Sequence, residues 1–182
     1  MVNSNEPRIE LVSLDQSHGE LAEILSAALT FNGKPLNIFA ALGHHPKLLK
    51  RFNLLGGLLL HEGLLPARER EIVVLRTGWK AGSQYEFGQH TIIALKCGLT
   101  QKEVAALTRA PHEHPWSRDD GALIALADEL SDEDCVSDPT WATLRERWST
   151  ARIVELLVLA AFYRPVSGFL NSARGPLDEV VP

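Results

Sequence analysis

The sequence predicts an all-α fold built from packed antiparallel helix hairpins. Three observations predict it: helix-start signals recur along the chain, apolar residues repeat at helical spacing, and strand signals are few. Only the run at 72–75 is rich in β-branched residues, and the charged residues on both sides of it favour a long helix over a short strand. At 182 residues the chain has about the length of one domain.

Several start and stop signals divide the chain into helices. Ser17 with Glu20, and Thr100 with Glu103, have the spacing of capping boxes, in which hydroxyl and carboxylate satisfy backbone donors at a helix start. Further boundary signals are Pro66, Gly98 and Ser117. We expect helices near 17–31, 46–62, 66–80, 84–97, 100–108, 117–131, 138–148 and 150–172, with a shorter turn around 35–43.

We expect an N-terminal extension over 1–16 and a single helical domain over 17–182, because no linker rich in Pro, Gly or Ser divides the chain. The beginning of the chain lacks the apolar run of a secretory signal. The richest apolar run, at 153–163, has 11 residues including Glu155, whereas a bilayer span needs about 20. The cytoplasm is therefore the expected compartment.

The charge balance bears on the partners. The chain has 18 Lys and Arg against 23 Asp and Glu, a formal charge of −5, and no basic cluster. Nucleic acids and anionic membranes are bound by basic surfaces, so neither is an expected partner. A small-molecule substrate is expected instead.

Cysteine and histidine placement bears on redox and metal chemistry. Cys97 and Cys135 are 38 residues apart, which excludes a CxxC pair, a thiolate zinc site and a disulfide framework. Scattered histidines could be read as a metal site or as exposed loop residues, and we favour the second reading for His44, His45, His112 and His114. We expect no metal and no bound cofactor.

Candidate catalytic residues lie on the two helices that flank Gly82. In an antiparallel hairpin centred on this turn, Glu71 faces His90 and Arg76 faces Glu86. The four side chains then form either a polar cluster inside an apolar helix pair or an ordinary solvated face. In the first case a nearby carboxylate raises the pKa of the histidine, and burial raises the pKa of a glutamate, as acid/base catalysis needs.

The chain resembles the carboxymuconolactone decarboxylase family, whose fold is shared with the AhpD alkylhydroperoxidases. The resemblance covers about 35–171 and rests mainly on Leu65-Pro66-Ala67-Arg68-Glu69-Arg70-Glu71-Ile72-Val73-Val74-Leu75, Gln84-Tyr85-Glu86-Phe87-Gly88-Gln89-His90 and Cys97-Gly98-Leu99-Thr100. It implies an AhpD-like domain of packed helical hairpins, assembly into homotrimers or homohexamers, and an active site beside a Glu and a His of the central hairpin.

The chain departs from the peroxidase branch of that resemblance. That branch carries a Glu, a C-x-x-C pair, and a His three residues after the second Cys. On this chain the Glu corresponds to Glu71 and the His to His90, but the two cysteine positions hold Ser83 and Glu86. Neither side chain is a redox thiol, so thiol peroxidase activity is not expected.

The resemblance then implies cofactor-independent acid/base chemistry of the decarboxylase type on a small carboxylated lactone or enone. His90 is the expected proton donor or acceptor, and Glu71 or Glu86 orients it. The candidate substrate-binding residues are Arg76, Ser83, Tyr85, Tyr163 and Asn171. For Arg76 the alternative is an ion pair with Glu86. Two alternatives stay open: an alkylhydroperoxidase-like protein without redox thiols, and a non-catalytic homo-oligomeric ligand-binding protein.

Overall fold

The structure, a computed structural model, describes residues 6–28, 30–31 and 33–179. The chain forms two compact units, one of residues 1–62 with 169–182 and one of residues 63–168. Both units are helical, which confirms the predicted all-α class; among the described residues, strands are confined to one pair of two residues each. The single domain over 17–182 stays a prediction, and the first five residues of the predicted extension lie outside the described part.

The first unit is built around α3, on which α1 and α2 pack. In chain order its elements are η1 (Leu14–Gln16), α1 (Gly19–Ala27), β1 (Thr30–Phe31), β2 (Lys34–Pro35), α2 (Asn37–Leu42), α3 (Pro46–Gly57) and the π-helical turn η2 (Leu58–Glu62). The strands pair antiparallel, with Thr30 opposite Pro35. Leu25 and Leu49 are fully buried and belong to the core of this unit.

Two predictions about the first helix are wrong. The helix expected over 17–31 ends at Ala27, and the chain turns into the β1–β2 pair because Gly33 takes a positive φ of 75°. The capping box expected at Ser17 and Glu20 does not form. His18 stands at the N-cap position instead, and the Ser17 hydroxyl donates backwards to the carbonyl of Ser13 at 2.7 Å.

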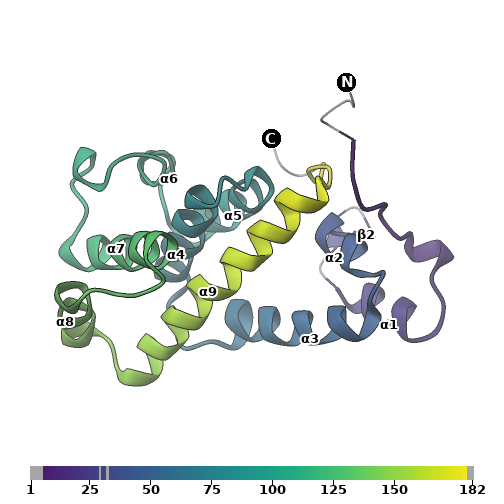
Figure 1. Cartoon of the computed structure of the whole chain (residues 1–182), viewed down its shortest axis with the longest axis horizontal. Helices are drawn as coiled ribbons and strands as arrows, with labels where there is room; N and C mark the ends of the chain where they lie inside the picture. Colours follow the sequence, from purple (N-terminus) through teal and green to yellow (C-terminus); the bar gives the residue numbers. More distant parts are fainter. Residues whose placement is uncertain (1–5, 29, 32, 180–182) are drawn as a thin grey trace. The chain divides into compact units, whose positions relative to one another are not determined.

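The second unit is built around α4, which packs against α5 and α7 (Figure 1). Its elements are α4 (Ala67–Lys80), α5 (Gln84–Lys96), α6 (Gln101–Ala106), η3 (Pro111–Glu113), α7 (Arg118–Asp132), α8 (Asp138–Arg147) and most of α9 (Thr150–Ala173). Every residue of α4 from Arg70 to Gly78 is buried. Because the helix is covered on all sides, its polar side chains must find partners inside the unit.

The helix boundaries of the second unit follow the predicted signals. Thr100 forms a complete capping box with Glu103, and the Ser117 hydroxyl accepts the backbone N–H of Asp120. Gly98 follows α5 with a φ of 97°, a conformation that favours glycine. These local hydrogen bonds explain why the predicted ends lie within a few residues of those observed.

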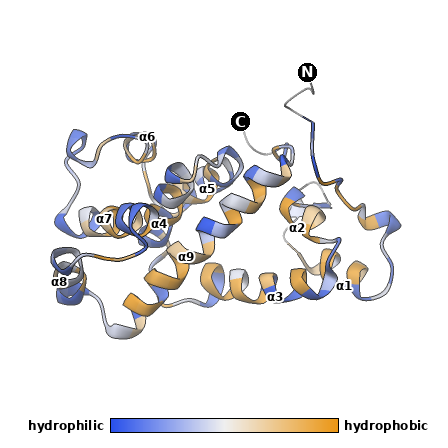
Figure 2. Cartoon of the chain, viewed as in Figure 1, coloured by the Kyte–Doolittle hydropathy of each residue, from blue (hydrophilic) through white to orange (hydrophobic). Residues whose placement is uncertain are grey.

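Helix α9 is apolar over most of its length (Figure 2). By length and composition it could cross a membrane, a test that the core helix of a soluble protein also passes. Its buried residues in the second unit include Ile153, Leu156, Leu159 and Tyr163, and they give it a packed face.

Candidate active site

The α4–α5 hairpin brings Glu71, Glu86 and His90 into direct contact. Glu71 Oε2 lies 2.6 Å from His90 Nδ1, and Glu86 Oε1 lies 3.1 Å from His90 Nε2. All three side chains are buried, and Glu71 has no exposed surface. The interpretation of these residues as a solvated face is therefore wrong: Glu71, Glu86 and His90, three of the four predicted members, form a polar cluster inside the hairpin.

Local backbone geometry positions Glu86 beside His90. Ser83 caps α5, and its hydroxyl accepts the backbone N–H of Glu86 at 3.3 Å. Across the hairpin lies Gly78 of α4, where an added Cβ would stand 3.4 Å from Glu86 Cγ. Glycine at this position leaves room for the glutamate side chain, and the sequence analysis did not single it out.

His90 has a carboxylate at each ring nitrogen. Burial alone would lower the pKa of His90, but the charge and hydrogen bond of Glu71, followed by those of Glu86, outweigh it and raise this pKa to about 9. At neutral pH the ring is therefore an imidazolium that donates one hydrogen bond to each carboxylate. The proton on Nε2 is shared with Glu86, and the proton on Nδ1 with Glu71.

Glu71 is held by a second cation. Its other oxygen, Oε1, accepts a hydrogen bond from Arg70 Nε at 2.8 Å. Burial would raise the pKa of Glu71, but the charges and hydrogen bonds of His90 and Arg70 outweigh burial and lower it. Sequence reasoning missed Arg70 because adjacent helical residues normally point in different directions, and only its proximity along the chain could have suggested the contact.

Tyr163 of α9 packs its ring against the imidazole. The two ring centres are 4.9 Å apart and the planes meet at 84°, an edge-to-face arrangement. Burial, and then the charges of Glu86 and Glu71, raise the pKa of Tyr163 well above its usual value. The phenol therefore stays protonated at physiological pH.

The sequence of this hairpin matches a known family profile. The match is to the carboxymuconolactone decarboxylase family, and it runs from residue 46 to residue 112. Residues 46–112 are thus similar to the carboxymuconolactone decarboxylase family. The segment includes Arg70, Glu71, Glu86 and His90, and the resemblance seen in the sequence is thereby confirmed.

Solved structures share the fold of this chain at low sequence identity. A Ralstonia eutropha protein described as an alkylhydroperoxidase AhpD core and uncharacterized peroxidase-related protein has a TM-score of 0.82 and 17% identity, covering 95% of this chain and 93% of that one. An uncharacterized peroxidase-related protein from a Silicibacter species has a TM-score of 0.82 and 14% identity, covering 98% and 96%.

A third solved structure, the debrominase Bmp8 in complex with 2,3,4-tribromopyrrole, has a TM-score of 0.73 and 14% identity, covering 96% of this chain and 95% of that one. At such identities these similarities show the fold alone. They confirm the predicted AhpD-like architecture. No curated protein matches the chain significantly in sequence.

Arg76 lies elsewhere in the unit, and its expected pairing with Glu86 is wrong. Its Nε and Nη2 donate to the two oxygens of Asp128 on α7, at 2.6 and 2.8 Å. Its Nη1 donates to the carbonyls of Leu107 and Arg109, at 2.7 and 2.8 Å. The guanidinium is thus directed to α7 and to the loop after α6, because position 76 lies on the α7 side of the central helix.

The other predicted substrate-binding residues lie in different surroundings. Ser83 and Tyr85 are buried at the start of α5, and Ser83 serves as the helix cap. Asn171 is exposed near the end of α9, in the segment that belongs to the first unit. The structure therefore brings Tyr163, but not Arg76, to His90.

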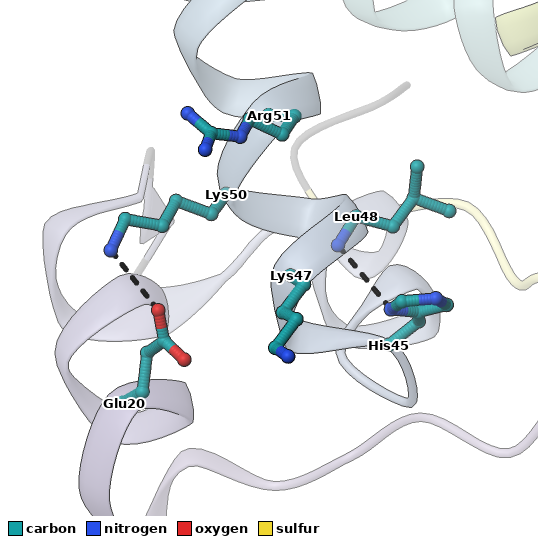
Figure 3. Close-up of a pocket in the computed structure, with 6 residues that line it drawn as sticks. All are labelled: Glu20, His45, Lys47, Leu48, Lys50 and Arg51. Carbon is teal, nitrogen blue, oxygen red and sulfur yellow. Dashed lines mark hydrogen bonds and ion pairs between the residues drawn. The ribbon is translucent and has the colours of Figure 1, made fainter.

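The two cysteines are free: Cys97 is partly exposed at the end of α5, and Cys135 is exposed. No group of three or more His, Cys, Asp or Glu in the described part of the chain could hold a metal ion. Three of the histidines considered for such a site, His44, His45 and His114, have other contacts. His45 Nδ1 accepts the N–H of Leu48 (Figure 3), and His114 stacks on Trp116 at 4.4 Å.

A separate pocket of about 480 Å³ lies in the first unit. Figure 3 shows its lining, which consists of Glu20, His45, Lys47, Leu48, Lys50 and Arg51. Lys50 pairs with Glu20 at 3.0 Å, and both side chains are about half exposed. An ion pair with this exposure contributes little to stability, and the pocket contains none of the residues around His90.

Proposed function

We propose that this protein is a cofactor-independent lyase of the carboxymuconolactone decarboxylase type. The single observation that carries the proposal is the buried series Glu86–His90–Glu71 on a hairpin that belongs to this family. A histidine held between two carboxylates in a water-poor interior is suited to general acid/base catalysis.

We assign the proton exchange with substrate to Glu86. Both ring nitrogens of His90 already face carboxylates, and Glu71 is held on its far side by Arg70. Glu86 therefore forms the end of the series opposite the Arg70–Glu71 ion pair. His90 serves as the proton reservoir behind Glu86, and Glu71 balances the charge of the imidazolium.

The reaction requires one proton and no electrons from the protein. The bond between the substrate carbon and its carboxylate breaks, CO₂ leaves, and the electron pair moves into a conjugated carbonyl to give a dienolate. His90 transfers its Nε2 proton to Glu86, Glu86 passes that proton to carbon, and solvent restores the proton of His90. The substrate class is a small carboxylated lactone or enone, because a conjugated carbonyl is needed to accept the electron pair.

Thiol chemistry of the AhpD type is not supported by these residues. Ser83 caps a helix and Glu86 pairs with His90 at the positions where the peroxidase branch carries its cysteines. A hydroxyl and a carboxylate do not form a sulfenic acid or a disulfide. The reductive chemistry of a debrominase would likewise need an electron donor that these two side chains do not provide.

Carboxymuconolactone is the direct probe for the proposal. We expect CO₂ release and one solvent deuteron on the product carbon in D₂O. Glu86→Gln and His90→Gln should each lower kcat by about 10² to 10⁴, the usual contribution of a general acid or base. Cys97→Ser is the control and should retain the wild-type rate.

Three results would contradict this proposal. An unchanged rate in His90→Gln would remove His90 from the mechanism. Peroxide consumption by the wild type that disappears in Cys97→Ser would support the alkylhydroperoxidase-like alternative. Ligand binding without turnover of any carboxylated lactone or enone would support the non-catalytic alternative.

We also propose that the chain acts in the cytoplasm as a homotrimer or homohexamer. Apolar side chains on two helices support the assembly: α3 exposes Leu54 and Leu55, and α9 exposes Val154 and Val158. Such exposed apolar side chains are typical of surfaces that become buried when subunits associate. Multi-angle light scattering should give three or six times the mass of the 20.1 kDa chain, and a monomer would contradict the assembly.

A further inference from the structure

We infer that Arg70 is a positioning residue that directs the proton of His90 toward Glu86 and away from Glu71. The inference rests on the proposed function and adds a residue that the sequence analysis did not place in the site. Its basis is geometric: Arg70 and His90 hold opposite oxygens of one buried carboxylate.

The imidazolium has two routes for proton release. The proton on Nδ1 lies 2.6 Å from Glu71, and the proton on Nε2 lies 3.1 Å from Glu86. By distance alone, the shorter contact favours transfer to Glu71. Such a transfer would be unproductive. Glu71 is fully buried, so a proton on its carboxylate would cancel the charges of the Glu71–His90 ion pair without reaching the substrate.

Arg70 makes the transfer to Glu71 unfavourable. Its guanidinium donates to Glu71 Oε1 at 2.8 Å and remains charged at any physiological pH. A carboxylate that faces a fixed cation is a weaker base, so Glu71 stays anionic. Because a buried imidazolium and a buried carboxylate stabilise each other, the proton stays on the His90 ring until it is transferred to Glu86.

The structure also shows how the side chain reaches this position. Arg70 and Glu71 are adjacent on α4, yet the contact forms because this part of the helix is buried and the Arg70 side chain is itself about nine-tenths buried. A solvated arginine would be screened and free to turn away. Burial keeps the guanidinium beside Glu71.

The test compares Arg70→Met with Arg70→Lys in the full-length chain, using carboxymuconolactone turnover and the ¹⁵N resonances of the His90 ring. In Arg70→Met we expect kcat to fall about 10- to 100-fold with KM changed less than threefold. At pH 7 the Nδ1 resonance should move toward that of an unprotonated nitrogen. Arg70→Lys keeps the charge and should restore at least part of both the rate and the resonance.

Arg68 provides the matched control. It lies two positions earlier on the same helix and pairs with Glu103 and Asp120, at 2.5 and 2.9 Å, outside the His90 cluster. Arg68→Met should lower the melting temperature and leave the His90 resonances unchanged. A resonance shift of equal size in Arg68→Met would show that Arg70 acts only through general stability.

The possible failures are distinguishable. If Arg70→Met keeps both the wild-type kcat and the His90 resonances while Glu86→Gln is inactive, the inference about Arg70 is wrong and the proposed function stands. If Glu86→Gln is fully active, the proposed function itself is wrong. If Arg70→Met does not fold, an unchanged His90 ring and wild-type kcat in the uncharged variant Arg70→Gln would overturn the inference.

Discussion

The two sides of α4 use buried arginines in different ways. Toward α7, Arg76 donates four hydrogen bonds, to a bidentate Asp128 and to two backbone carbonyls. Toward α5, Arg70 shares the carboxylate of Glu71 with His90. Both guanidinium groups are buried to a similar extent. The difference lies in these partners: the α5 cluster includes the imidazole of His90, whereas the Arg76 cluster consists of a carboxylate and two carbonyls.

This comparison separates a structural cluster from a candidate catalytic one. The Arg76 partners are a carboxylate and two backbone carbonyls, with no imidazole among them. The Arg70 cluster contains an imidazole whose proton can leave in either direction. Burial and charge are therefore insufficient to identify a catalytic site. The distinguishing feature is whether the cluster contains an imidazole that can exchange a proton.

The largest effect is expected on the α7 side. Arg76→Met leaves Asp128 and the carbonyls of Leu107 and Arg109 without their donor in a largely buried setting. Breaking such a pair from one side costs about 3–5 kcal/mol, so we expect the free energy of unfolding in urea to fall by about this amount. The ¹⁵N resonances of His90 in the folded fraction should not move.

A contrary result would weaken the comparison. If Arg76→Met shifts the His90 resonances as strongly as Arg70→Met does, the two sides of α4 are coupled and the structural role assigned to Arg76 is incomplete. Asp128→Asn tests the same clamp from the other partner and should also destabilise the fold without altering the ring.

A smaller effect is expected from pH on the α5 side. The pKa of His90 is raised from an ordinary 6.5 to about 9 in the folded protein. The protonated ring therefore stabilises the fold fully below pH 6.5, and this contribution is lost as pH rises through about 9. By linkage it amounts to roughly 3 kcal/mol.

Urea unfolding at pH 7 and at pH 9.5 measures this contribution, and His90→Gln is the matched variant. The wild type should lose stability between the two pH values, whereas His90→Gln should lose much less. Equal losses would place the titrating group elsewhere and would remove the distinction between the two sides of α4.

The sequence predicted the α5 side better than the α7 side for a physical reason. Glu71 and His90 belong to one hairpin whose short turn, with Gly82 at a φ of 63°, sets which positions face each other. Arg76 and Asp128 are 52 residues apart, so their contact depends on how α7 packs. The contact between Arg70 and Glu71 depends on the burial of the Arg70 side chain, which the neighbouring sequence does not indicate.

The same contrast applies to the helices. Long amphipathic or buried helices with capping residues were predicted to within a few residues, because their hydrogen bonds are local. The β1–β2 pair was missed because each strand has two residues, too few for an alternating pattern. The catalytic and substrate-binding roles of the site residues stay predictions.

The smallest effects separate two capping boxes that look alike in sequence. Thr100 Oγ1 accepts the N–H of Glu103 at 3.2 Å, and Glu103 Oε2 accepts the N–H of Thr100 at 2.8 Å. Thr100→Ala should therefore cost about 1 kcal/mol. Ser17 instead bonds the carbonyl of Ser13 in an exposed segment, so Ser17→Ala should change stability by less than about 0.5 kcal/mol. Urea unfolding of the two variants side by side measures the difference, and equal losses would mean that Ser17 caps α1 in solution.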